Sequence, residues 1–328
     1  MTNVSATGPS PLPFGPQAPW LAPLAGFTDL PFRLLCRENG ARVAHTEMIS
    51  VKGLIYNSQG TWDLLATAPA DTPLVVQLFG ADPDCFAQPV RWLAERGFHW
   101  IDLNAGCPVR KVIKTGAGAA LMEDPQRLVR IMQTIGRAAP VQAGVKLRLP
   151  ADGSTDGLLR LRDTLARAGV SWITLHPRTA RQGYGGSAQW SALSRMAESS
   201  PVPIVASGDL WNAQAARRCF EQTGVDGIMF ARGALHNPRI FKADLTTGAE
   251  EDPCTDTASI AALVRRHGQL CRRYDPSRSM LLKMRSFIPR YVKGFPGAKQ
   301  ARKGIIACQD WEAFEQYADQ LEEALAGQ

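Results

Sequence analysis

Residues 141–176 read VQAGVKLRLPADGSTDGLLRLRDTLARAGVSWITLH, two short apolar runs with an amphipathic segment between them. The runs VQAGVKLR (141–148) and VSWITLH (170–176) have the length and composition of buried strands. The segment GLLRLRDTLARAG (157–169) has the periodicity of a helix and ends in a glycine, which suits a helix C-terminus. A strand, a helix and a strand in this order predict a parallel βαβ unit.

The same alternation continues on both sides of this unit. Six further apolar runs end in Gly, Pro or a lone polar residue: PWLAPLA (19–25), RVAHTEM (42–48), PLVVQLF (73–79), WIDLN (100–104), VPIVAS (202–207) and VDGIMFA (225–231). Amphipathic segments lie between several of them: DCFAQPVRWLAERG (84–97), PQRLVRIMQTIGRA (125–138) and NAQAARRCFEQTG (212–224). Eight such units predict an α/β fold, a (β/α)8 TIM barrel over residues 19–245, with a doubly wound open sheet as the alternative.

Both flanks of the predicted barrel have a different character. Residues 1–18 are proline-rich and predict an extended leader, and TTGAEEDPCTDT (246–257) predicts a polar linker. Beyond the linker, four segments have helical patterns: 258–274, 279–295, 299–308 and 310–327. We therefore expect three or four helices, packed as a small C-terminal helical bundle over residues 258–328.

The composition excludes several classes of protein. Of the 328 residues, 45% are hydrophobic and 20% charged, as in a globular protein with a large core. No apolar stretch approaches the ~18 residues of a membrane helix, and the opening residues lack a signal peptide's pattern, so we expect a cytoplasmic protein with no membrane segment. The seven cysteines form no C-x-x-C pair and no zinc-ligand spacing, so neither a disulfide framework nor a metal is expected. No pattern indicates an obligate protein partner.

The positive charge is concentrated in one region. Residues 260–305 hold twelve Lys and Arg and a single acid, Asp275, a net charge of +11 against +7 for the whole chain. Basic residues interleaved with aromatic ones are typical of a surface that binds nucleic acid, although a solvated helix face has the same composition.

Polar residues stand at the end of nearly every predicted strand, where a TIM barrel builds its active site. They include Glu47, Gln77, Asn104, Lys146, His176, Ser207, Asp209 and Arg232. Several buried polar groups at equivalent positions cost stability, which favours a shared function over chance. Lys146 would place an ammonium at the barrel mouth, where it can stabilise negative charge on a cofactor ring.

Two turns after the seventh and eighth strands predict a phosphate site. They are SGDL (207–210) and ARGAL (231–235), where glycines allow close backbone approach and Arg232 adds a charged donor. Neither a Walker A motif nor a complete G-x-G-x-x-G is present, so flavin mononucleotide (FMN) suits the chain better than a Rossmann-bound dinucleotide.

Cys107 is the only cysteine in a loop directly after a predicted strand, within NAGCPVRKVIKTGAGAAL (104–121). A thiol at a barrel mouth can act as a nucleophile or as a proton donor. The basic residues Arg110, Lys111 and Lys114 that follow it could meet phosphates.

Together these motifs resemble those of the tRNA-dihydrouridine synthases, most closely the bacterial B-type branch, over about residues 19–310. The most specific motif is N-A-G-C-P (104–108) with G-A-G-A-A-L downstream. Supporting motifs occur in the family's order: A-P-L-A-G-F-T-D-L-P-F-R (22–33), Q-L-F-G (77–80), V-K-L-R (145–148), H-P-R-T (176–179), S-G-D (207–209) and A-R-G-A (231–234).

The resemblance implies a function and a set of site residues. FMN would be bound by the backbone of Pro23, Leu24 and Ala25 and by Gln77, Lys146 and His176, with its phosphate end held by Ser207, Gly208, Asp209, Ala231 and Arg232. NADPH would reduce the flavin, which would deliver a hydride to C6 of a uracil in tRNA, while Cys107 protonates C5 as the catalytic acid. Substrate contacts are expected from Asn104 and Arg178, and RNA contacts from Arg272, Arg273, Lys283 and Arg290.

The chain departs from the family pattern at two positions. Ser207-Gly208-Asp209 replaces the commoner N-G-D, and Leu24 replaces a frequent methionine, but backbone contacts survive both changes. Two alternatives stay open. A flavin barrel that acts on a free pyrimidine leaves the basic region unexplained, and a non-catalytic RNA-binding scaffold leaves Cys107, Lys146 and His176 unexplained.

Overall fold

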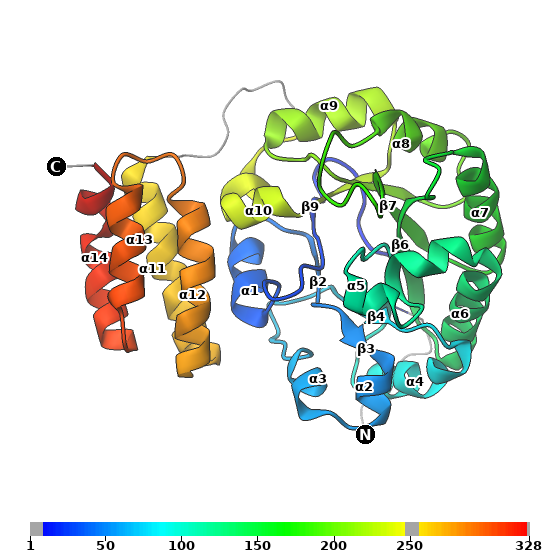
Figure 1. Ribbon diagram of the computed structural model, residues 1–328, viewed down its shortest axis with the longest axis horizontal. Helices are drawn as coiled ribbons and strands as arrows, with labels where there is room; N and C mark the ends of the chain where they lie inside the picture. The colour runs from blue at the N-terminus through cyan, green and yellow to red at the C-terminus, as the bar shows by residue number, and fades with distance from the viewer. Residues whose placement is uncertain (1–8, 247–255, 327–328) are drawn as a thin grey trace.

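The computed structural model describes residues 9–246 and 256–326. Outside this part lie residues 1–8 of the predicted leader, residues 247–255 of the predicted linker with Cys254, and residues 327–328. Figure 1 shows a barrel beside a separate group of helices.

Eight parallel strands close the barrel, as the sequence predicted. They are β1 (Trp20–Leu21), β2 (Val43–His45), β4 (Leu74–Phe79), β5 (Trp100–Ala105), β6 (Gln142–Leu149), β7 (Trp172–Thr179), β8 (Ile204–Ser207) and β9 (Gly227–Phe230). Each pairs with the next in this order, and β1 pairs with β9, which excludes the open sheet. A two-residue strand that was not predicted, β3 (Ile49–Ser50), pairs with the end of β4.

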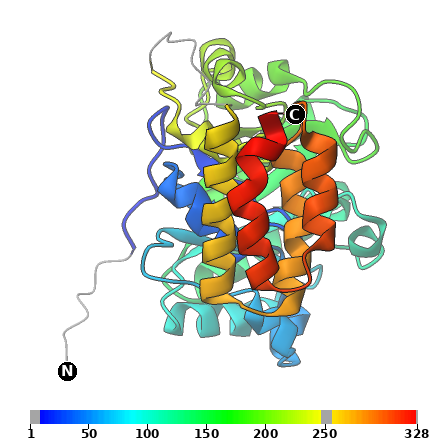
Figure 2. The same cartoon turned by 90° about the vertical axis from the view of Figure 1, so that its left-hand side faces the viewer.

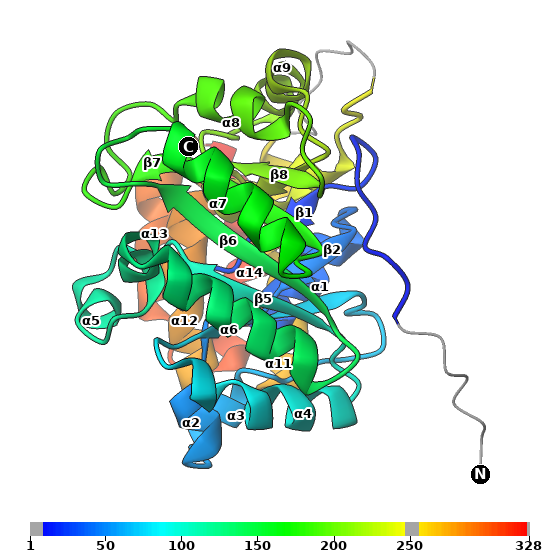
Figure 3. The same cartoon turned by 90° about the vertical axis from the view of Figure 1, so that its right-hand side faces the viewer.

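Helices surround the barrel and connect its strands (Figures 1 and 3). They are α1 (Leu30–Glu38), α2 (Val51–Ile55), α3 (Gln59–Asp63), α4 (Ala87–Glu95), α5 (Arg110–Ile113), α6 (Pro125–Ala138), α7 (Asp156–Arg167), α8 (Trp190–Ala197), α9 (Ala213–Thr223) and α10 (Arg232–His236). Three short 3-10 helices are η1 (Pro83–Cys85), η2 (Gly118–Glu123) and η3 (Pro238–Lys242).

Local signals set the ends of these helices. Asp29, Asp124 and Asn212 cap α1, α6 and α9, each side chain accepting a hydrogen bond from a backbone N–H of the first turn. Gly224 ends α9 with φ +64°, the left-handed conformation that the sequence pattern indicated.

The barrel interior is apolar near the strand starts and polar near the strand ends. Trp20, Val43, Val75, Trp172, Val205 and Met229 pack with Leu12 as the apolar part. Residues 9–18 form no helix or strand, but they lie across the strand starts: Trp100 and Gln142 donate to the carbonyls of Ser10 and Pro9, at 3.2 and 2.6 Å. The described part of the leader therefore closes one end of the barrel.

Within residues 256–326, the helices α11 to α14 follow the barrel as an antiparallel bundle, which confirms the predicted C-terminal helices (Figure 2). They are α11 (Thr257–Tyr274), α12 (Arg278–Tyr291), α13 (Ala298–Ala307) and α14 (Trp311–Ala326). Buried apolar residues such as Val264, Met284, Ile305 and Leu321 fill the space between them. The bundle packs on the barrel through α11 against α1 and α12 against α10. None of the helices described has the length and apolar character to cross a membrane.

Candidate active site

A cavity of about 650 Å³ opens at the carboxyl ends of the barrel strands. Thirteen of the predicted site residues line it: Pro23, Leu24, Ala25, Asn104, Cys107, Lys146, His176, Ser207, Gly208, Asp209, Ala231, Arg232 and Arg290. They come from every quarter of the chain, and the barrel brings them together because all parallel strands end at the same face. Gln77, Arg178, Arg272, Arg273 and Lys283 do not line the cavity.

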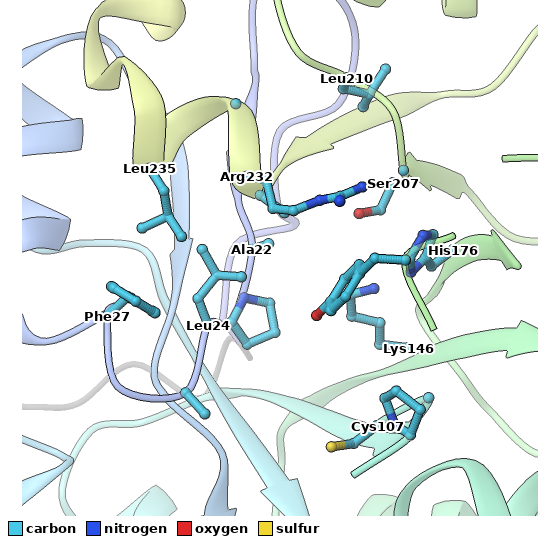
Figure 4. Close-up of a pocket in the computed structure, with 18 of the residues that line it drawn as sticks. Ala22, Leu24, Phe27, Cys107, Lys146, His176, Ser207, Leu210, Arg232 and Leu235 are labelled. Atoms are coloured by element: carbon cyan, nitrogen blue, oxygen red, sulfur yellow. The ribbon is translucent and has the colours of Figure 1, made fainter. Parts of the chain in front are cut away.

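The loop after β5 presents the Cys107 thiol to this cavity (Figure 4). The side chain of Asn104 fixes the loop, because its Oδ1 accepts hydrogen bonds from the backbone N–H groups of Cys107 at 2.9 Å and Gly106 at 3.2 Å. The Cys107 carbonyl accepts from the Ala119 N–H at 3.0 Å. Gly118 has φ +63°, and a Cβ there would lie 2.8 Å from that carbonyl, so only glycine fits. The thiol's position thus depends on backbone contacts and not on its own bonds.

A buried chain of hydrogen bonds holds Asn104 from below. Its Nδ2 donates to Gln77 Oε1 at 2.8 Å, and Gln77 Nε2 donates to Asp102 Oδ2 at 2.6 Å. Asp102 is fully buried, and burial raises its pKa to about 7. Gln77 was predicted to bind the cofactor, but here it lies beneath the cavity lining and orients the amide of Asn104. A flavin contact by Gln77 and a uracil contact by Asn104 stay predictions.

Lys146 is the cation at the centre of the polar part of the barrel. In Figure 4 its ammonium lies between Cys107 on one side and Ser207 and Arg232 on the other. Burial, together with the neighbouring Arg148, lowers the pKa of Lys146 to about 8, although Asp102 partly opposes the shift. Within residues 9–246 and 256–326 its ammonium makes no hydrogen bond or ion pair. A partly buried, unpaired cation facing a cavity is suited to an anionic or polar ligand.

Burying the charged Lys146 side chain costs folding stability, so the substitution Lys146→Met should change the free energy of unfolding in a pH-dependent way. Without ligand, we expect the variant to unfold with a free energy about 3 kcal/mol higher than wild type at pH 7, because the folded-state pKa of about 8 lies below the unfolded value of 10.5. Between these two pH values the unfolded state binds more protons, so wild-type stability rises with pH and the difference disappears by about pH 10.5. Urea unfolding across this range measures it, with the exposed Lys114→Met as control. A variant less stable than wild type at pH 7 would contradict the interpretation.

His176 is held as a neutral imidazole. Burial lowers its pKa to about 2, and the cations Lys146 and Arg148 act in the same direction. Its Nε2 lies 3.2 Å from Arg178 Nη1, and since a guanidinium can only donate, Nε2 is the acceptor and the proton sits on Nδ1. Gly208, with φ +106°, packs so closely on this ring that a Cβ would approach it to 2.6 Å.

An ion-pair network supports the turn between β8 and α9. Arg178, 1% exposed, donates to both carboxylate oxygens of Asp209 at 2.8 Å and to the carbonyl of Gly186 at 2.6 Å. Asp209 also accepts from the Ala188 N–H at 2.7 Å and lies 3.4 Å from Arg232. Arg178 therefore shapes the site from behind the lining, and its predicted substrate contact stays a prediction.

The four predicted RNA-binding residues fall into two groups. Arg272 and Lys283 are ion-paired, Arg272 with Glu312 and Glu315 of α14 and Lys283 with two carboxylates of the barrel. Arg273 lies over the ring of its neighbour Tyr274, 5.3 Å away. Arg290 lines the cavity and lies 4.7 Å above the Phe27 ring.

Several lining residues were not predicted. Arg148 follows Lys146 by two positions on β6, so the period of a strand places both inside the barrel, a signal that was available in the sequence. The rings of Tyr184 and Trp211 both contact the Arg232 guanidinium, with centroids 4.6 and 4.5 Å from its Cζ. They stand in loops, where no periodicity indicates which way a side chain points.

The family model for dihydrouridine synthases matches residues 20–326. The chain belongs to this family. This confirms the resemblance seen in the motifs, and as a dihydrouridine synthase the protein is an oxidoreductase. Within the described residues, no group of three or more His, Cys, Asp or Glu side chains is placed to hold a metal ion.

Named relatives of this dihydrouridine synthase match most of its length. The probable tRNA-dihydrouridine synthase 1 of Synechocystis sp. is 32% identical over 289 residues, 87% of this chain and 81% of that protein. The tRNA-dihydrouridine synthase B of Pseudomonas aeruginosa is 31% identical over 297 residues, 89% of both chains.

Solved structures with a similar fold are more distant. Histamine dehydrogenase from Rhizobium sp. 4-9 has a TM-score of 0.53 and 12% identity, over 76% of this chain and 48% of that one. 2-Naphthoyl-CoA reductase has a TM-score of 0.52 and 8% identity, over 69% and 49%. This dihydrouridine synthase spans about half the length of each, and the likeness concerns the barrel fold alone.

Proposed function

We propose that this protein reduces a uridine of tRNA to 5,6-dihydrouridine, with FMN as cofactor and NADPH as reductant. The observation that carries the proposal is the convergence of the Cys107 thiol and the unpaired Lys146 ammonium on one cavity, in a chain of the dihydrouridine synthase family. Since tRNA and NADPH are both present in the cytoplasm, we propose that the reaction takes place there.

The cavity suits FMN in size and in the chemistry of its lining. Its volume lies within the ~300–1,000 Å³ typical of cofactor sites. Lys146 offers a charge to an electron-rich ring. Gly208 lines the cavity while packing against His176 so closely that a Cβ would meet the ring at 2.6 Å. Arg232, at the first turn of α10, offers a charged donor to a phosphate. Pro23, Leu24, Ala25, Ser207, Asp209 and Ala231 complete the proposed cofactor site.

In this reaction the cofactor and the residues of the cavity have separate roles. When bound, FMN supplies the hydride that is added to C6 of the uracil and that NADPH replaces. Addition at C6 builds negative charge at C5 and O4, and Cys107 donates the proton that C5 requires. Asn104 holds the Cys107 loop in place. The neutral imidazole of His176 and the guanidinium of Arg178 support the part of the cavity wall that carries Gly208 and Asp209.

A uridine within folded tRNA must leave its stack to reach this cavity. Positive charge at the cavity mouth can hold the surrounding phosphates. Arg290 lines the cavity, and exposed Lys293 lies near it. Burial lowers the pKa of the lining residue His236, and the positive charges of Lys293 and Arg290 lower it further, which shows that both cations lie close to the cavity. We therefore assign the mouth-side RNA contact to the C-terminal end of α12.

The function is tested by incubating purified protein with NADPH and tRNA that lacks dihydrouridine. We expect a gain of two hydrogen atoms in one tRNA uridine, measured by mass spectrometry of digested tRNA, and yellow protein with flavin absorbance. Reduction of free uracil but not of tRNA would favour a free-pyrimidine enzyme, and a colourless inactive protein would favour a scaffold.

Salt dependence tests the assignment of Arg290 and Lys293. The double variant Arg290→Gln/Lys293→Gln should lose about two phosphate contacts, so the slope of log affinity for tRNA against log salt should become shallower by about 1.5 to 2. The matched control is Arg160→Gln/Arg167→Gln, two exposed arginines of α7, on the barrel side away from the bundle (Figure 1). An unchanged slope in the first variant would show that RNA docks elsewhere.

A further inference from the structure

One face of α12 contacts the loop between β1 and α1, which lines the cavity at Pro23, Leu24, Ala25 and Phe27. Lys283, Phe287 and Arg290 follow one another at helical spacings of four and three and so share a face. Phe287 packs edge-on against Phe27, with ring centroids 5.4 Å apart, and Arg290 lies above the same ring. The bundle therefore forms an outer support for one wall of the active site.

Lys283 makes the polar part of this contact. Its Nζ lies 2.6 Å from Asp29 Oδ2 and 3.5 Å from Glu47 Oε1, and all three side chains are less than a quarter exposed. Burial opposes the charged form of Lys283, but Asp29 and Glu47 outweigh it and raise its pKa. An ammonium enclosed by two carboxylates has no free charge to offer to an RNA phosphate.

Glu47 contacts both Lys283 and the loop that lines the cavity. Its Oε2 accepts a 2.5 Å hydrogen bond from the backbone N–H of Gly26, an exposed residue with φ +81°. That bond holds the turn that carries Ala25 and Phe27. Asp29, the other partner of Lys283, is the N-cap of α1 and ends the same loop.

We propose that Lys283 is a positioning residue for the cofactor-facing loop, acting through Glu47 and Gly26, and not an RNA contact. The effect on FMN binding rests on the proposed function, whereas the link from Lys283 through Glu47 to Gly26 rests on the contacts alone. Without the ammonium, Glu47 loses its counter-charge, the Glu47 side chain is freed to turn to solvent, and the Gly26 N–H loses its acceptor. The helical bundle is then a part of the flavin site as well as an RNA-binding module.

Hydrogen exchange of the full-length protein, as purified and without RNA, tests the link directly. In Lys283→Met, the amide of Gly26 should exchange about tenfold faster than in wild type, because a charge-assisted bond on an exposed amide is weakened. FMN should bind severalfold more weakly, measured by flavin fluorescence, while tRNA affinity stays unchanged. Lys283→Arg should restore both properties, since a guanidinium can also bridge Asp29 and Glu47.

Two further variants keep the test decisive. Arg272→Met removes the same charge from an ion pair inside the bundle and should change neither Gly26 exchange nor FMN affinity. Glu47→Gln should raise Gly26 exchange, and adding it to Lys283→Met should bring little further change, because both act on one bond. Unchanged exchange at Gly26 in Lys283→Met, or a fall in tRNA affinity with FMN affinity intact, would overturn the proposal. A failure of the exchange test alone leaves the proposed reaction standing, and absence of activity with the exchange result intact rejects only the reaction.

Discussion

Cys107→Ala should keep its flavin and the reduction of that flavin by NADPH, yet lose the oxidation of the reduced enzyme by tRNA. A general acid matters only once charge develops on the uracil, and proton transfer of this kind contributes about 10² to 10⁴ in rate, or about 3 to 5 kcal/mol of barrier. The Cys107 loop should survive the substitution, because Asn104, Ala119 and Gly118 hold it through the backbone.

Stopped-flow mixing of the reduced enzyme with tRNA measures this step in a single turnover. Cys107→Ser should also be slow, since a hydroxyl is a far weaker acid than a thiol. Cys85→Ala is the matched control, because Cys85 is the other partly exposed cysteine in the described chain and lies at η1, outside the cavity lining. A loss of less than tenfold in Cys107→Ala would remove Cys107 from the acid role, and loss of flavin would make it a structural residue.

Arg178→Met should destabilise the fold far more than the loss of an arginine from a surface ion pair. Removing one partner of a buried ion pair costs about 3 to 5 kcal/mol when the remaining charge has no other partner. Asp209 is partly exposed and keeps Arg232 and the Ala188 N–H as partners, so we expect the lower end, about 3 kcal/mol. The carbonyls of Gly185 and Gly186 also lose their donor, so the loop that carries Tyr184 should become mobile. Arg178→Lys should recover little of the stability, because one ammonium cannot reproduce the guanidinium's several donors.

Urea unfolding gives the free-energy difference for these variants. Arg195→Met is the control, since it breaks an arginine–aspartate pair with Asp156 whose side chains are 48% and 73% exposed, and such pairs contribute less than about 1 kcal/mol. If both variants lose the same free energy, then the network behind the cavity contributes no more than a surface pair does.

The barrel and much of its mouth could be predicted from the sequence because they follow from short-range patterns. Each strand shows itself as a short apolar run, and parallel closure then places every strand end at one face. Cys107, Lys146 and His176 were found together by this rule alone. The sequence does not show how deep a side chain lies. Gln77 stands in an apolar run and Arg178 in the H-P-R-T motif, yet their partners Asp102 and Asp209, 25 and 31 residues further along the chain, hold both side chains behind the lining.

The basic surface of the bundle was also only partly predictable from the sequence. The excess of Lys and Arg between residues 260 and 305 predicted one basic surface, but acids elsewhere in the chain pair with part of it. Arg272 pairs with Glu312 and Glu315, and Lys283 pairs with Asp29 and Glu47, more than 230 residues away. Such pairing depends on how helices pack, which no local pattern encodes.

The barrel closes by pairing its first strand with its last, so the first strand cannot complete its contacts until the last has been synthesised. β1 pairs with β9 at Trp20↔Met229 and Leu21↔Phe230, and Gly15 donates to the Asp226 carbonyl at 2.7 Å. At about 5 to 20 residues per second, the ribosome needs on the order of 10 to 40 s to make the roughly 210 residues between these partners. During that interval Leu12, Trp20 and Leu21 have no completed core to enter. The apolar residues of the newly made N-terminal segment thus stay without these partners until β9 has been made, and a stalled ribosome would lengthen that time.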